Sequence, residues 1–145
     1  VCLVLMAAVA FAAVSKEYGQ LDSLINASAE LIGGSKVFGA FFMLILGLFI
    51  TMGIGSSFST VPIVATVLVP LGVQLGMSHA AIILLVAASG ALGDSGAPSS
   101  NQTLIPTSAF NIDGQHDHIK DSCIPSFLFV NIPLIIVCAI VGCII

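Results

Sequence analysis

Residues 90–103 read GALGDSGAPSSNQT and interrupt an otherwise apolar part of the chain. The apolar run before them, residues 80–92, is too short to cross a bilayer alone, because a spanning helix needs roughly 20 residues. The stretch then supplies a carboxylate, hydroxyls, an amide, glycines and a proline before an apolar-leaning segment resumes at Leu104. Irregular backbone at membrane depth occurs only where it is buried in protein or lines a wet cavity. The stretch therefore predicts a broken transmembrane helix, the arrangement that builds ion and substrate sites in membrane transport proteins.

The composition indicates an integral membrane protein. Hydrophobic residues make up 58% of the 145 residues and charged residues 7%, against roughly a quarter charged in soluble domains. Three lysines and a net charge of −4 give no surface for nucleic acid. The chain shows no nucleophile–base pair within the membrane segments, no metal-ligand spacing and no nucleotide loop, so we do not expect an enzyme. The four cysteines form no CxxC pair and are read as small hydrophobes.

The predicted fold is an all-α membrane protein with about five transmembrane segments, in one domain covering residues 1–145. The segments are residues 1–14, 37–54, 61–76, the broken pair 80–92 with 104–110, and 123–145. The first is read as a truncated transmembrane helix, so we expect the C-terminal part of a longer chain. Residues 15–36 predict a short amphipathic helix that ends at Gly33-Gly34, and an ordinary connecting helix is an equal alternative.

Two further polar stretches flank these segments. Residues 51–60, TMGIGSSFST, predict irregular backbone at a helix end, with Pro62 in the first turn of the next helix and Pro70 kinking it. Residues 111–122 are the most polar part of the chain and are expected in water or at the headgroups. Within them His116 and His118 are more typical of solvated imidazoles than of a metal site or proton relay.

The pattern places one ionisable side chain, Asp94, inside a membrane segment. A charge there costs free energy, so such a residue is by default a candidate for a functional site. It is a candidate ligand for Na⁺, which prefers oxygen, and a candidate proton acceptor. The alternative is a helix cap at the break. Neutral oxygens from both polar stretches complete the candidate site. The alternative for the stretch after Asp94 is an ordinary turn between helices. The alternative for residues 51–60 is that the hydroxyls bond to carbonyls of their own helix. These residues are Ser95, Ser99, Ser100, Asn101, Thr103, Ser56, Ser57 and Thr60.

Three motifs resemble those of the NhaC-type sodium/proton antiporters, over roughly residue 38 to the end. GDSGAPSSNQT at 93–103 resembles their GD-x-x-SP-x-S-(D)-T signature, GQHDHIKD at 114–121 followed by Pro125 is similar to their DHI segment, and GSSFST at 55–60 is similar to their G-x-S-x-G-T helix. The branch that is most similar includes proteins described as amino-acid (histidine) permeases.

The resemblance implies a secondary transporter of the bacterial inner membrane, built from inverted repeats, with Na⁺ and/or H⁺ as coupling ions and no other cofactor. Asp94, Ser99 and Thr103 match motif positions directly. The partners expected are the lipid bilayer, these ions, a small organic solute and a second copy in a homodimer.

One position departs from the family pattern. Asn101 stands where the pattern usually has Asp, which removes a carboxylate from the candidate site. We hypothesise that this favours sodium-coupled or facilitated uptake of a solute over proton exchange; an Asn101→Asp variant with unchanged pH dependence and ion coupling would count against it. The alternatives to an antiporter are thus a cation-coupled permease for an amino acid such as histidine and, in another class, a non-transporting membrane component or inactive fragment.

Overall fold

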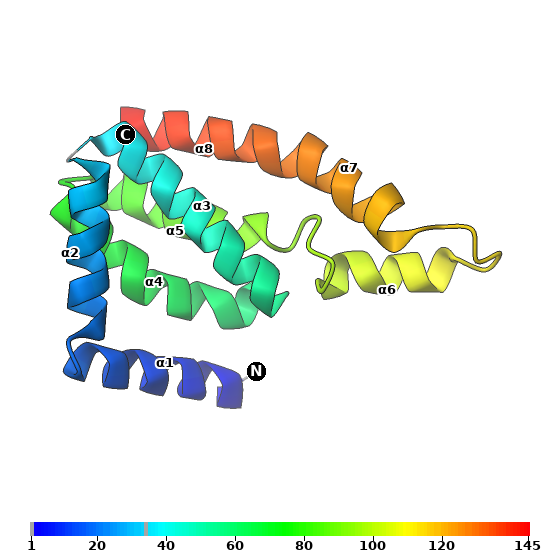
Figure 1. The fold of residues 1–145 in the computed structure, drawn as a ribbon, viewed down its shortest axis with the longest axis horizontal. Helices are drawn as coiled ribbons and strands as arrows, with labels where there is room; N and C mark the ends of the chain where they lie inside the picture. Colours follow the sequence, from blue (N-terminus) through cyan, green and yellow to red (C-terminus); the bar gives the residue numbers. More distant parts are fainter. Residues whose placement is uncertain (1, 34) are drawn as a thin grey trace.

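A computed structural model describes residues 2–33 and 35–145, and every regular element in that part of the chain is a helix (Figure 1). The isolated helices are α1 (Cys2–Glu17), α2 (Gln20–Ile32), α3 (Lys36–Ile54), α4 (Ser57–Gln74), α5 (His79–Leu92) and α6 (Asn101–Phe110). A last continuous run consists of η1 (His118–Cys123), α7 (Ile124–Ser126), η2 (Phe127–Asn131) and α8 (Ile132–Ile144). The prediction of an all-α chain is confirmed.

Helix α5 lies at the centre of the bundle and packs against α3, α4 and α8. Its largely apolar sequence explains this position, because a helix that is hydrophobic all round is buried on most sides. The largest fully buried apolar side chains come from α3, α4 and α5 and form the core: Met43, Leu44, Leu68, Leu71, Leu85 and Leu92. This core fixes the C-terminal end of α5, where the polar break begins.

Small residues bring α3 and α5 into close contact. A Cβ added to Gly47 would collide with Ser89, and one added to Gly93 would collide with Thr51. The Thr51 hydroxyl lies 2.7 Å from the carbonyl oxygen of Gly47 and 3.1 Å from that of Ser89 on the other helix. Small residues at helix contacts, joined by interhelical hydrogen bonds, are typical of membrane proteins.

Within residues 2–33 and 35–145, three helices are long and apolar enough to cross a membrane: Lys36–Ile54, Ser57–Gln74 and His118–Ile144. Helix α5 is a shorter apolar helix, as the broken-segment prediction requires, and the total of about five segments stays a prediction. The last span begins five residues before the predicted residue 123. It starts within the polar segment because the Asp117 carboxylate accepts hydrogen bonds from the N–H groups of Ile119 and Lys120 and caps the helix.

The last helical run stays continuous through two prolines because each is preceded by a π-helical turn. The N–H of Ile124 donates to the carbonyl of Ile119, five residues back, just before Pro125. In the same way, the N–H of Ile132 donates to Phe127 just before Pro133. Proline lacks an N–H and its ring clashes with the carbonyl four residues earlier. The wider turn removes that clash without ending the helix.

The short amphipathic helix predicted within residues 15–36 is α2, which begins after Gly19 (φ 67°) and ends at Ile32, with Gly33 (φ 63°) as its C-cap. Residues 15–17 belong to the end of α1. Gly34 and Val1 lie outside the described residues. Figure 1 shows α2 at one end of the bundle, joining α1 to α3, and it also contacts α4.

The irregular backbone predicted for residues 51–60 is limited to two residues. Helix α3 runs through Ile54, Gly55 has φ 71°, and α4 begins at Ser57. The stretch is shorter than predicted because the Gly55 N–H still donates to Thr51 and a single left-handed residue redirects the chain. Pro62 consequently lies inside α4, in its second turn, and not in the first turn as predicted.

Candidate functional site

The predicted break is present between α5 and α6, but it is shorter than the sequence indicates. Helix α6 begins at Asn101, and its N-cap Ser100 accepts a hydrogen bond from the N–H of Gln102 at 3.3 Å. Asn101 and Thr103, predicted in open backbone, therefore lie in the first turn of α6, because Ser100 caps that turn. Figure 1 shows α6 extending away from helices α1 to α5, and none of its residues is buried.

Asp94 is buried, with 8% of its surface exposed. Its Oδ1 accepts from the N–H of Ser57 at 3.2 Å. Its Oδ2 accepts from the Ser57 hydroxyl and from the Gln102 amide at 3.1 Å. The carboxylate thus caps α4, a helix on the other polar stretch, and not a helix at its own break as the cap alternative supposed. A helix N-terminus stabilises a carboxylate, so burial is compensated without a basic side chain.

A cavity of about 150 Å³ opens beside this carboxylate. It is lined by residues from the start of α4, from the break and from the first turn of α6: Gly55, Ser56, Ser57, Phe58, Asp94, Asn101 and Gln102. A water occupies about 30 Å³ of liquid volume, so the space admits a cation with a few waters. Four of the predicted site residues, Asp94, Ser56, Ser57 and Asn101, are brought together here.

The other predicted residues lie outside this cavity and hold the backbone around it. The Ser99 hydroxyl donates to the Met52 carbonyl at 3.0 Å, and Thr103 donates to Ala97 at 3.0 Å. The Thr60 hydroxyl bonds back to the Ser56 carbonyl at 2.7 Å, which is the alternative given for that hydroxyl cluster. The Ser95 carbonyl accepts a hydrogen bond from the side chain of Asn131.

The residues around Asp94 fit a hard monovalent cation better than a transition metal. The cavity offers one carboxylate together with hydroxyl and amide oxygens, the ligand type that hard cations prefer. Among the described residues no group of three or more His, Cys, Asp or Glu side chains is placed to hold a metal ion. A cation bound here would therefore keep a single charged ligand.

Gln102 and Asn131 were not among the residues predicted for the site. Gln102 follows the N-cap serine by two positions, and that helix start would have pointed its side chain back to the break. Asn131 lies in an apolar run and is polar where a spanning helix is otherwise apolar. A polar residue within an apolar run was the feature of the sequence that could have identified Asn131 as a site residue.

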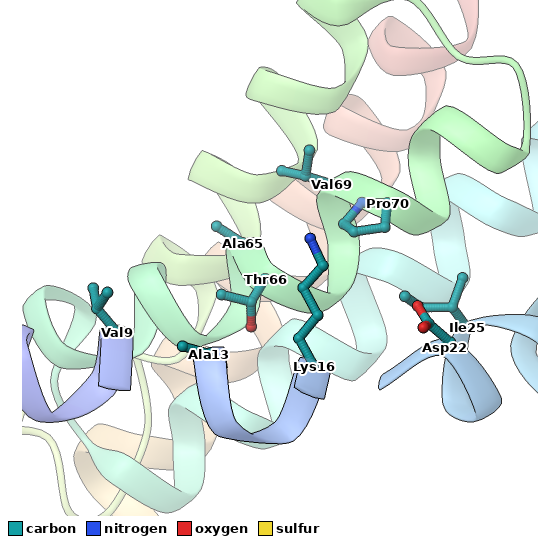
Figure 2. A pocket seen from close by; sticks show the side chains of 9 residues that line it. All are labelled: Val9, Ala13, Lys16, Asp22, Ile25, Ala65, Thr66, Val69 and Pro70. Carbon is teal, nitrogen blue, oxygen red and sulfur yellow. The ribbon is translucent and has the colours of Figure 1, made fainter. Parts of the chain in front are cut away.

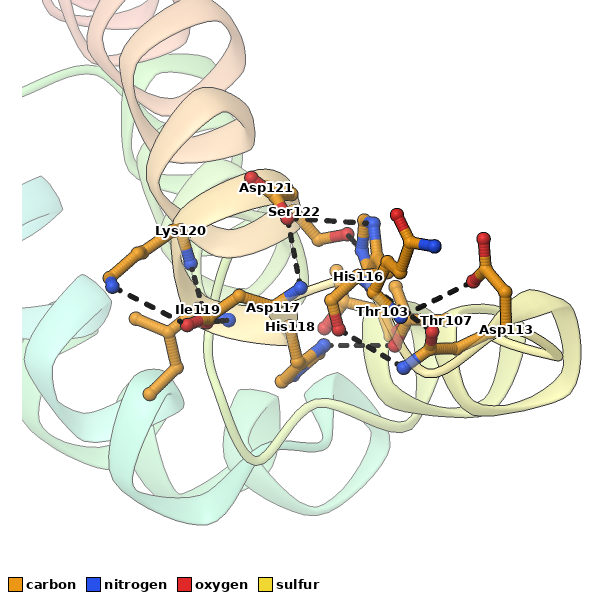
Figure 3. Close-up of polar contacts among 12 residues, drawn as sticks. Thr103, Thr107, Asp113, His116, Asp117, His118, Ile119, Lys120, Asp121 and Ser122 are labelled. Carbon is orange, nitrogen blue, oxygen red and sulfur yellow. Dashed lines mark hydrogen bonds and ion pairs between the residues drawn. The ribbon is translucent and has the colours of Figure 1, made fainter.

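The prediction of solvated histidines is wrong for His118, which joins three segments; Figure 3 shows its contact with Thr107. Its Nε2 lies 3.1 Å from the carbonyl oxygen of Pro98 in the break, and its Nδ1 lies 2.9 Å from the Thr107 hydroxyl on α6. His116 is also paired, with the Ser122 hydroxyl at 2.8 Å. Both imidazoles are half-buried because the polar loop folds back between α6 and η1.

Ion pairs in the described chain are confined to this polar loop. Lys120 lies 3.7 Å from Asp117, and His116 lies 3.9 Å from Asp121. The N–H of Lys120, which donates to the Asp117 carboxylate, is the main reason that the pKa of Asp117 lies below its usual value. The carboxylate of Asp94 takes part in neither pair.

Two of the larger cavities are mainly apolar and lie near the elements described above. One of about 500 Å³ lies between α1, α2 and α4, and Figure 2 shows Lys16 and Asp22 projecting from different helices at its edge. It includes none of the predicted site residues. The other, of about 340 Å³, lies between the break and the last helical run and is lined in part by Gly96, Pro98 and Phe127. Cavities therefore border the break on two sides, and Asp94 lines only the smaller of these two.

Apolar helices of spanning length around a broken helix define an all-helical membrane protein. The chain belongs to the Na⁺/H⁺ antiporter family, which it matches over residues 1–143. The family resemblance is confirmed, and the family is one of transport proteins and not of enzymes.

Three bacterial relatives are similar to 92% of the chain. A Bacillus subtilis protein that carries the name "Putative amino acid transporter YuiF" is 52% identical. Uncharacterised membrane proteins of Vibrio parahaemolyticus and Haemophilus influenzae are 50% and 47% identical. The chain spans about 30% of the length of each of these curated relatives. No solved structure matches the chain.

Proposed function

We propose that this chain, as one transmembrane domain of the bacterial inner membrane, carries the cation site of a secondary active transporter. Asp94 is the charged ligand, and Ser56, Ser57 and Asn101 supply neutral oxygens. The observation that carries this proposal is a buried carboxylate that lines a cavity and forms no ion pair with any described residue. Intramembrane carboxylates are costly and mark ion pathways.

The hydrogen bonds of Asp94 suggest how it handles an ion. A carboxylate has about four lone-pair sites, and the Ser57 N–H, the Ser57 hydroxyl and the Gln102 amide occupy three of them. The one remaining lone-pair site can bind one partner at a time, either a cation or a proton. Competition between Na⁺ and H⁺ for one carboxylate is a sufficient physical basis for exchange.

The second candidate function is a cation-coupled permease for an amino acid such as histidine. Two observations favour it: the name of the Bacillus subtilis relative, and the neutral Asn101 in the cavity where the family pattern has a carboxylate. In proteoliposomes the two functions differ in whether labelled solute accumulates when a Na⁺ or pH gradient is imposed. An antiporter moves ions alone, whereas a permease moves the solute with them. A protein that moves neither ions nor solute would overturn both.

The test of the site is the Asp94→Asn variant in proteoliposomes. Loss of a charged hydrogen-bonding ligand corresponds to about 1.5–3 kcal/mol, so the half-saturation constant for Na⁺ should rise about 10- to 100-fold. Asp113→Asn is the matched control, because Asp113 is an exposed loop aspartate, and its flux should equal that of the wild type. Full ion-driven flux in Asp94→Asn would refute the assignment.

A further inference from the structure

Asn131 is the polar side chain in the last helical run that is fully buried, with 0% exposure. Its Nδ2 donates to the carbonyl oxygen of Ser95 at 2.6 Å, one residue beyond Asp94. Its Oδ1 is buried without a hydrogen-bond partner among the described residues. Buried polar atoms are almost always paired, and an exception calls for an explanation such as an ion.

The orientation of the amide follows from its partner. Turning the group over would place Oδ1 against the Ser95 carbonyl, so that two acceptors would face each other. The Nδ2 atom must therefore face Ser95, and Oδ1 remains the unpaired atom. The unpaired oxygen is consequently a property of the fold and not of an arbitrary amide assignment.

The backbone around Asn131 also lacks N–H groups that could donate to nearby carbonyl oxygens. Asn131 ends the π-helical turn η2, in which the N–H of Ile132 donates to Phe127. Pro133 has no N–H, so the Leu128 carbonyl has no backbone donor at either of the next positions, 132 and 133. Such π-turns are frequent at functional sites. This turn combines an unpaired side-chain oxygen with a carbonyl that lacks its usual donor.

We propose that Asn131 Oδ1 is a ligand for Na⁺ in a second subsite at the break, separate from the cavity at Asp94. The proposal rests on the proposed function. Asn131 is not among the residues that line the Asp94 cavity, and its contact is to the Ser95 backbone. An amide oxygen suits a hard cation and does not titrate near neutral pH. Na⁺ at Asn131 is therefore not in competition with protons, unlike Na⁺ at Asp94.

The test measures Na⁺ binding by the intact protein, as the rise in unfolding temperature in NaCl relative to choline chloride and as Na⁺-dependent flux in proteoliposomes. Asn131→Ala should raise the half-saturation constant for Na⁺ about tenfold or more, by the same factor at pH 6 and pH 8. Its unfolding temperature in choline chloride should stay near that of the wild type. Asn26→Ala, which removes an exposed amide bonded to Gln74, is the control and should change neither measurement.

A second variant keeps the test informative if Asn131→Ala does not fold. Asn131→Asp retains an oxygen at the Oδ1 position but titrates, so Na⁺ binding should persist at pH 8 and weaken at pH 6. If Na⁺ binding by this variant does not depend on pH, residue 131 is not a ligand for Na⁺.

Two other outcomes overturn the inference. If Asn131→Ala lowers the unfolding temperature equally in both salts and leaves Na⁺ affinity unchanged, Asn131 only positions the break. If the half-saturation constant rises for the solute and not for Na⁺, the oxygen binds the solute. Either result, with the half-saturation constant for Na⁺ still raised in Asp94→Asn, leaves the proposed function intact, whereas a fully active Asp94→Asn defeats the proposed function itself.

Discussion

Between α5 and α6 the chain leaves helical geometry over residues 93–100, whereas the run from His118 to Ile144 stays helical through two prolines. The break contains Gly93, Gly96, Pro98 and hydroxyls. Glycine admits backbone that other residues resist, and serine side chains bond to nearby backbone in place of the helix. A single proline removes one donor, which a π-turn absorbs. The polar, glycine-rich stretch therefore ends helix α5, whereas each proline of the last apolar run is accompanied only by a local widening of the helix.

The two regions also handle buried polar groups differently. Asp94 beside the break has three hydrogen-bond donors from two helices. Asn131 in the continuous run keeps an unpaired oxygen. One of the donors to Asp94 is the backbone N–H of Ser57, free at the start of α4, and the side chains of Ser57 and Gln102, at the starts of α4 and α6, supply the other two. A helix that stays closed has no such groups to offer.

The largest effect is expected where the two regions touch, at Gly96. Its φ is 85°, and a Cβ there would lie 2.9 Å from the Cys123 carbonyl oxygen and from the Phe127 nitrogen. Gly96→Ala should destabilise the protein by about 2–4 kcal/mol, through left-handed backbone strain and overpacking. Thermal unfolding in detergent measures the loss.

Gly114→Ala is the matched control for Gly96→Ala. Gly114 has φ 69° but open space around it, so it should lose only the strain, about 1–2 kcal/mol. Equal losses in the two variants would mean that the contact between the break and the last run contributes nothing.

A smaller effect is expected from the donors to the buried carboxylate. Ser57→Ala removes the hydroxyl that donates to Asp94, and hydrogen bonds to charged groups contribute about 1.5–3 kcal/mol. Ser59→Ala, in the same turn of α4, removes a hydroxyl that bonds only to the Ser56 carbonyl and should cost less than about 1 kcal/mol. Chemical unfolding measures the free energy of unfolding of both variants. If Ser59→Ala lowers it as much as Ser57→Ala does, the hydrogen bond to Asp94 makes no special contribution.

The smallest effect is expected at Asp117, the exposed cap of the continuous run. Its pKa is lowered in the folded state, chiefly by the Lys120 N–H, below the unfolded value of about 3.9. The stabilisation is therefore present at neutral pH and is lost as the pH falls through the folded pKa. Asp117→Asn should unfold slightly earlier than wild type at neutral pH, and the two should converge as the pH falls through the lowered pKa of Asp117. A constant difference across that range would exclude the ionised cap.

The sequence predicted the features that depend on local pattern. The break, the buried Asp94 and the two facing serines follow from composition and from the cost of charge in a membrane. The contacts of Asp94 with Ser57, 37 positions away, and with Gln102 depend on how α4 and α6 pack, which periodicity cannot supply. The helix start at His118 was missed because a cap overrode the polarity of the segment. Asn131 was missed because apolar neighbours surround it.

The close contact of α3 with α5, at Gly47 with Ser89 and at Gly93 with Thr51, determines which parts can act as a fixed frame. Lipid tails are as apolar as leucine, so burial gives no driving force between helices in a bilayer, and short-range contact takes its place. That attraction falls steeply when backbones separate by even an ångström. The α3–α5 pair is thus the most closely packed part of the described chain, and we expect helix displacements in α6, which among the helices contacts mainly η1.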